Sequence, residues 1–155
     1  MNTVISTYKD IVGYFEDACT AHLAIKQFAE GPIDYLDANS QNIKYPFVFL
    51  RPLVSPGINE ASGTRSLTFE LYCLDVPKLS DESPLQVKSN TELYLYDVVS
   101  YISYGPVGNQ NGFAVTINNI TPVNEAFQDR VYGWVGNITT SEQAIYNYCN
   151  YPDAP

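Results

Sequence analysis

The sequence predicts a single α+β domain, in which one antiparallel (mixed) sheet carries two helices packed on one face. Three observations lead to this expectation. A helix-like apolar stripe opens the chain, a second helical period follows near residue 85, and strand-like alternation fills the segments between and after them. No internal repeat and no linker interrupt this order. We therefore expect one domain over residues 1–140 and an extended C-terminal arm over residues 141–155.

Apolar side chains near the N-terminus recur every three or four residues, which is the spacing of an amphipathic helix. The stripe consists of Val4, Tyr8, Ile11, Val12, Phe15, Ala18, Cys19, His22 and Ile25. Asn2 or Thr3 can cap the start of this helix, and Gly31-Pro32 ends any helical continuation. The helix can also stop near His22, because residues 23–28 are compatible with a strand.

Two strand-like segments come next, separated by a turn-rich loop over residues 57–63. Residues 45–53 are β-branched and aromatic, but Pro46 and Pro52 each remove a donor from the ladder. This strand is therefore expected near a sheet edge, or is limited to its central residues. Apolar and polar side chains alternate over residues 66–73, which predicts a strand with one core face and one solvated face.

A second helix is expected after a polar loop, because Ser83 and Ser89 each begin a four-residue capping pattern ahead of an apolar-periodic run. Its expected buried side comprises Val87, Thr91, Tyr94, Leu95, Val98 and Ile102, and the candidates for its exposed side are Glu92, Tyr96 and Ser100. A turn over residues 105–112 follows. Two antiparallel strands, over residues 113–118 and 131–138, complete the predicted domain.

Charge and cysteine content narrow the classes of function. The 155 residues include 17 acids and 8 scattered bases, which gives a formal net charge of −9. Tight binding to a phosphate backbone needs clustered cations and is not expected, although an acidic surface can face DNA without holding it. Cys19, Cys73 and Cys149 show no paired spacing and are expected to be reduced thiols. Neither secretion nor membrane insertion is expected.

The residues give no pattern typical of an enzyme. His22 is the only histidine, and its place on the apolar stripe favours a core or subunit-interface role over catalysis or metal binding. The adjacent acids Glu16-Asp17 and Asp81-Glu82 are expected to be solvated, as is Asp97 on the second helix. No glycine-rich phosphate loop occurs. We expect no catalytic residue, no cofactor and no metal.

Tyrosine is frequent, with 13 residues, whereas charged residues make up only 16% of the chain. Tyrosine is favoured at protein interfaces because it combines a large apolar ring with a polar tip, but it is also a good strand former. The candidates for a subunit interface are Tyr94, Tyr101, Trp134, Tyr146, Tyr148 and Tyr151. The last three lie in a tail without helical or strand period, which we expect to lie across another surface.

Several short motifs, spread over most of residues 1–139, together resemble the pattern of a known protein family. They are His22 with Ile25 and Phe28, Tyr45-Pro46, residues 64–75, Ser89-Asn90-Thr91 with Asp97, and Asp-Arg-Val-Tyr-Gly-Trp at residues 129–134. This set resembles small tail-terminator or neck proteins of tailed bacteriophages, and residues 129–134 are its most suggestive part. The resemblance covers the helices and strands but not the tyrosine-rich tail.

The resemblance implies a non-enzymatic virion protein that forms a ring, six-fold or twelve-fold, with neighbouring neck or tail proteins as partners. It implies that DNA passes through the lumen of the ring without tight binding. It leaves open whether the chain is a tail terminator or another neck ring. The alternative from the residues themselves is a monomeric binding module, whose aromatic surface forms a ligand cleft.

Overall fold

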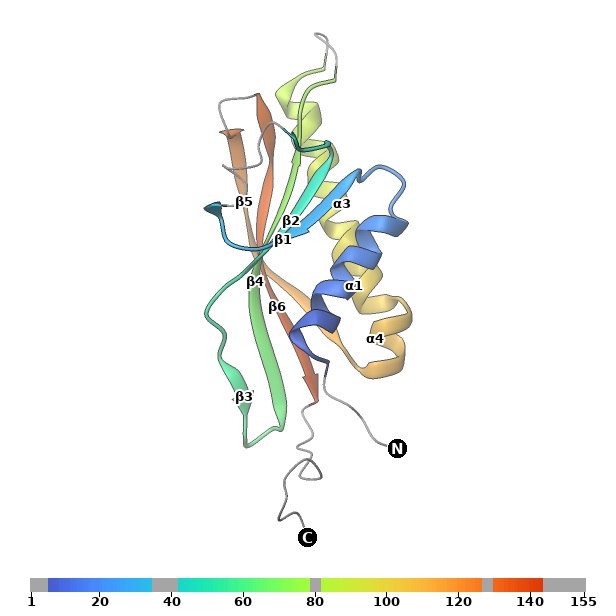
Figure 1. Cartoon of the computed structure of the whole chain (residues 1–155), viewed down its shortest axis with the longest axis vertical. Coiled ribbons are helices and arrows are strands. Elements are labelled where there is room, and N and C mark those ends of the chain that lie inside the picture. Colours follow the sequence, from blue (N-terminus) through green and yellow to red (C-terminus); the bar gives the residue numbers. More distant parts are fainter. Residues whose placement is uncertain (1–5, 35–41, 79–81, 127–129, 144–155) are drawn as a thin grey trace.

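A computed structural model describes residues 6–34, 42–78, 82–126 and 130–143 of the chain. Its helices lie on one side of a six-stranded, mostly antiparallel mixed sheet (Figure 1). The α+β fold with helices packed against one sheet face is therefore confirmed.

The sheet is organised around the long strand β4. The strands are β1 (Gln27–Glu30), β2 (Phe47–Pro52), β3 (Gly57–Asn59), β4 (Thr64–Asp75), β5 (Ala114–Ala126) and β6 (Val131–Gln143). Their order is β1-β2-β4-β6-β5, and β3 pairs with the first residues of β4. The β1–β2 pair is parallel and all other pairs are antiparallel. β2 and β3 thus follow each other along one side of β4, and β6 covers its other side.

The first helix, α1 (Tyr8–Ala21), begins later than the sequence predicts. Thr7 is its N-cap: the Asp10 N–H donates to the Thr7 hydroxyl at 3.2 Å, and the Thr7 N–H donates to the Asp10 carboxylate at 2.7 Å. This reciprocal capping box satisfies free donors of the first turn, so the helix starts here. Asn2 and Thr3 lie outside the described residues.

α1 ends at Ala21, in agreement with the expectation that it can stop near His22. The following residues include β1, so the strand alternative for residues 23–28 is confirmed in part, and Gly31 follows a strand instead of a helix. β2 lies between β1 and β4 and is limited to Phe47–Pro52. Both expectations for that strand hold, because it lies next to the edge strand β1 and is limited to the inner part of residues 45–53.

The second helix, α3 (Pro84–Tyr104), is capped by Ser83, whose hydroxyl accepts the Gln86 N–H at 3.2 Å. Its predicted buried side is confirmed except for Tyr94, which is half-buried, while Val99 is buried in addition. The predicted turn after it contains a short helix, α4 (Pro106–Asn111). A Cβ on Gly105 would lie 2.2 Å from the Tyr101 carbonyl oxygen, so the junction of the two helices requires glycine.

The sheet has apolar clusters on both faces. The larger one lies between the helices and the sheet and includes Phe15, Leu71 and Leu95. The smaller one contains Phe47, Phe49, Leu74 and Val131, with the half-buried Tyr72 packed against it. Side chains alternate between faces along a strand, so this smaller cluster lies on the face away from the helices. The prediction of a solvated second face for residues 66–73 is wrong at Tyr72.

The last two strands are longer than the sequence predicts. β6 continues through Gln143, and its last three residues pair with residues 64–66 of β4. The strand thus extends past residue 140, where the arm was expected to begin. The remainder of the expected arm, residues 144–155, lies outside the described residues, together with Tyr146, Tyr148 and Tyr151.

Candidate interaction surface

Large apolar side chains reach solvent mainly on α3. Eight such side chains are exposed in the described part of the chain, and five of them belong to α3: Leu85, Leu93, Tyr96, Tyr101 and Tyr104. We call these five side chains the α3 face. Positions 93, 96, 100 and 104 are spaced by three or four residues, which places them on one side of a helix, and the core-facing residues Leu95 and Ile102 point away from them. The sequence has only three charges in α3, namely Lys88, Glu92 and Asp97.

Leu23 extends this surface beyond α3. Its side chain is 97% exposed, directly after the end of α1. A shallow depression of about 340 Å³ lies beside it, lined by Ala18, Ala21, His22, Leu23, Asp97 and Tyr101. This volume is at the lower end of the range of about 300–1,000 Å³ that small-molecule sites occupy.

The single histidine connects the end of α1 to the middle of α3. His22 Nε2 lies 3.0 Å from Asp97 Oδ2, and His22 Nδ1 accepts the Ala24 N–H at 3.1 Å. Because Nδ1 is an acceptor, the neutral ring carries its proton on Nε2 and donates it to Asp97. Both ring nitrogens are thus engaged within the protein, and neither has a free lone pair for a substrate proton or a metal.

The positions of His22 and Asp97 agree in part with the sequence prediction. The His22 side chain is only 17% exposed, and its ring meets the edge of Tyr94 at a centroid distance of 5.1 Å. Asp97 is 59% exposed, as expected for the solvated side of the helix, but it is also the partner of His22. Sequence reasoning missed this pair, because no local pattern links residues 75 positions apart.

The described candidates for a subunit interface occupy different environments. Tyr101 is exposed on the α3 face, whereas Tyr94 is half-buried beside His22. Trp134 is half-buried on β6, and its Nε1–H donates to the Lys88 carbonyl at 2.9 Å, so it fastens α3 to the sheet. Leu23, Leu93 and Tyr104 are exposed residues that the sequence reading did not name. The helical spacing of apolar residues on the outer side of α3 could have revealed two of them.

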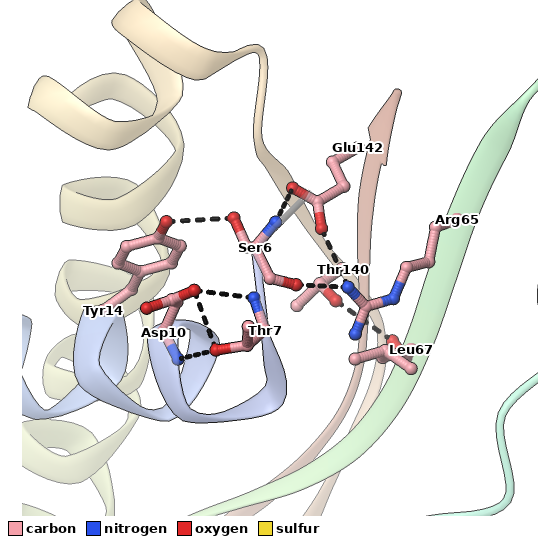
Figure 2. Close-up of polar contacts among 8 residues, drawn as sticks. All are labelled: Ser6, Thr7, Asp10, Tyr14, Arg65, Leu67, Thr140 and Glu142. Atoms are coloured by element: carbon pink, nitrogen blue, oxygen red, sulfur yellow. Dashed lines mark hydrogen bonds and ion pairs between the residues drawn. The ribbon is translucent and has the colours of Figure 1, made fainter. Parts of the chain in front are cut away.

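A second polar cluster fixes both ends of the described chain (Figure 2). Glu142 in β6 accepts the Ser6 N–H at 3.3 Å, and Arg65 Nη1 in β4 donates to the Ser6 carbonyl. Arg65 Nη1 also lies 3.3 Å from Glu142 Oε1, and the Ser6 hydroxyl lies 3.0 Å from the Tyr14 hydroxyl. The entry to α1 is therefore held against the end of the last strand.

The two described cysteines are buried and unpaired. Burial raises the pKa of the Cys19 thiol to about 12, with a smaller contribution from Glu16, and burial raises the pKa of Cys73 well above its usual range. Thiols of this kind are unreactive at neutral pH because the thiolate is the nucleophile. Over residues 6–34, 42–78, 82–126 and 130–143, no three His, Cys, Asp or Glu side chains gather as a metal site.

A scan of protein-family models found no match to this chain, and neither did a search of curated protein sequences. None of the helices in the described ranges is both long and apolar enough to span a membrane.

Proposed function

We propose that this chain is a structural virion protein of a tailed bacteriophage, a ring-forming neck or tail-terminator subunit that joins the head to the tail or caps the tail tube. Its role is to make contacts with copies of itself and with neighbouring neck or tail proteins. It has no catalytic residue and needs no cofactor or metal. The ring is six-fold or twelve-fold.

The observation that carries this proposal is the α3 face. A helix on the surface of a monomer normally presents polar and charged residues to solvent, whereas α3 presents tyrosines and leucines with few charges. Aromatic enrichment with depletion of charge is the composition of interface cores. Together with Leu23, the face is a candidate for burial in an assembly.

The residues that carry the phage resemblance support the proposal in a second way. His22 and Asp97 both belong to that set, and they are joined by a hydrogen bond between helices. Trp134, the last residue of the 129–134 segment, fastens β6 to α3. Both contacts hold α3 in place, so the resemblance residues support the helix that carries the exposed face.

A monomeric aromatic-rich binding module remains the second candidate, and the depression beside Leu23 favours it. This depression has an apolar wall formed by Ala18, Leu23 and Tyr101, and a polar edge at Asp97. A small ligand with an apolar group and a hydrogen-bond donor would fit such a site. The two functions differ in the state of the free protein, because only the ring requires self-association.

The solution mass of the purified protein separates the two candidates. Light scattering after gel filtration, repeated over a range of concentrations, is expected to give six or twelve times the 17.3 kDa chain mass at high concentration. Leu93→Ser with Tyr104→Ser should shift this equilibrium towards the monomer, and the exposed Thr116→Ser on β5 is the matched control. The ring is contradicted if the purified protein stays monomeric at all concentrations and is also present as a monomer in phage particles.

DNA is proposed to pass through the ring without being held. The net charge of −9 repels phosphates, and the scattered bases cannot replace a run of counterions. A mobility-shift assay at low salt is expected to show no retained DNA. Salt-sensitive binding at submicromolar protein would contradict this part of the proposal.

A further inference from the structure

We infer that residues 144–155 of one copy lie along the α3 face of a second copy. The inference rests on the proposed ring and names the surface that receives the C-terminal segment within it. Three properties of the chain lead to it. They are the matching composition and length of the α3 face and of residues 144–155, the point where β6 ends, and the distance that the segment can span.

The α3 face and the segment match in composition and length. Residues 144–155 contain Ile145, Tyr146, Tyr148 and Tyr151 and a single charged residue, Asp153. The face likewise presents leucines and tyrosines. A helix of 21 residues is about 32 Å long, and 12 extended residues span about 40 Å. The segment is therefore long enough to cover the whole face, and tyrosine rings on both sides favour such a contact.

The starting point of the segment is fixed near the C-terminal end of α3. Val115 in β5 pairs with Thr140 in β6, and Ser103 in α3 bonds the Val115 backbone through its hydroxyl at 3.2 Å. Glu142 is bound to Ser6 and Arg65, and these contacts hold the end of β6 against β4 and the start of α1. Figure 1 shows the end of β6 and the α3–α4 junction at the same end of the molecule.

The reach of the segment favours a second copy over its own. Tyr146 is three residues past Gln143, so it lies within about 10 Å of the end of the strand. The α3 face points away from the sheet, and a helix is about 10–12 Å across with its side chains. Within its own chain the segment would first have to pass around α3, which leaves fewer of its residues to cover the outer face. An adjacent copy has no such restriction, and there all three tyrosines can make contact.

The chain contains a suitable probe, because Cys149 lies within the segment while Cys19 and Cys73 are buried with raised thiol pKa values. One copy carries Ser100→Cys, at an exposed position in the middle of the α3 face, together with Cys149→Ser. The other copy is the parent chain. After co-expression and treatment with a flexible bis-maleimide, we expect a crosslinked pair whose digest contains positions 100 and 149.

Thr116→Cys with Cys149→Ser is the matched control, since Thr116 is exposed on β5 and faces away from the core-facing residues Val115 and Ile117. Its crosslinking to the parent should be at least ten-fold weaker. Ser89→Cys, at a second exposed position on α3, repeats the test if the Ser100 variant fails to fold.

The outcomes separate this inference from the proposed function. A further variant, Ser100→Cys with Cys149 kept, tests contact within one chain. A crosslink that forms within this variant, but not between the two separately marked copies, overturns the inference, as does equal crosslinking of the Thr116 control. An oligomer of full mass without the crosslink overturns the inference and leaves the ring in place. A monomeric protein overturns both.

Discussion

Arg65 and Glu142 form a largely buried ion pair across β4 and β6 that also holds the backbone of Ser6. The two side chains are 17% and 7% exposed, with 3.3 Å between Arg65 Nη1 and Glu142 Oε1. The carboxylate accepts the Ser6 N–H, and the guanidinium donates to the Ser6 carbonyl. Each charge thus has both an ionic and a peptide partner, which offsets the cost of removing it from water.

Removal of one member of this pair is expected to destabilise the fold strongly. Glu142→Ala leaves the Ser6 N–H without its acceptor and the Arg65 guanidinium without its counter-charge, with only the Ser6 carbonyl still bound to it. The free energy of unfolding should therefore fall by about 3 kcal/mol. Urea denaturation measures this change. The double variant Arg65→Met with Glu142→Leu should lose less than the sum of its single variants, because no charge is left unpaired.

The Arg51–Glu70 pair is the control for that experiment. Its atoms are 2.9 Å apart, but its side chains are 35% and 26% exposed. Arg51→Ala breaks this pair while Glu70 still accepts the Tyr72 hydroxyl at 2.9 Å, so it should cost no more than about a third of the loss expected for Glu142→Ala. Equal losses for Arg51→Ala and Glu142→Ala would show that burial of the Arg65 pair has no special effect.

Replacement of the single histidine is expected to affect folding or assembly. His22→Ala removes the hydrogen bonds to Asp97 and Ala24 from a mostly buried position, and a loss of roughly 1–3 kcal/mol is typical of such a change. Asp97→Asn is the matched variant, since its amide oxygen can still accept from His22 Nε2 and its cost should be much smaller. A folded, assembling His22→Ala protein that had lost a turnover present in the parent would refute a structural role.

The structural features that depend on residues close together in the sequence, such as helix faces and helix caps, could be predicted. The buried side of α3 follows from a period of three and four residues, and its Ser83 cap follows from the spacing to Gln86. The start of α1 was placed too early because its capping box uses Asp10, where the usual pattern has Glu or Gln. The apolar residue Val4 then suggested a longer helix.

Contacts between distant segments could not be predicted from local patterns. The parallel pairing of β1 with β2 and the pairing of β3 with β4 depend on the register of the whole sheet. The His22–Asp97 and Ser6–Glu142 contacts join residues 75 and 136 positions apart. Sequence reasoning identified Tyr101 on the candidate surface. It could not identify Leu23, because this residue lies outside the helices and no periodic pattern of apolar residues includes it.

Asp75 is expected to make stability depend on pH. The residue is 2% exposed, and burial raises the pKa of its carboxyl group, although its hydrogen bond from the Val76 N–H acts in the opposite direction. A raised pKa means that the folded state favours the protonated acid. The charged form therefore reduces stability at neutral pH, and this penalty disappears as the pH falls through the raised pKa.

Asp75→Asn keeps an oxygen for the Val76 N–H and removes the charge. We expect this variant to unfold at higher urea concentration than the parent at pH 7, with a difference that shrinks as the pH is lowered towards about 4, where a free Asp begins to protonate. Asp17→Asn, at an exposed position on α1, should show no such convergence. A parent protein more stable than Asp75→Asn at pH 7 would mean that the carboxylate has a stabilising partner.

Deletion of residues 144–155 is expected to separate folding from assembly. β6 ends at Gln143, and Glu142 anchors Ser6 and Arg65, so a cut after Gln143 preserves every described contact of the strand. A cut before Ser141 would remove these contacts and destabilise the domain. The shorter deletion should therefore keep the circular dichroism spectrum and the urea midpoint of the parent, while its incorporation into particles falls. Loss of folding would place residues 144–155 in the domain core, and unchanged incorporation would mean that they are dispensable for assembly.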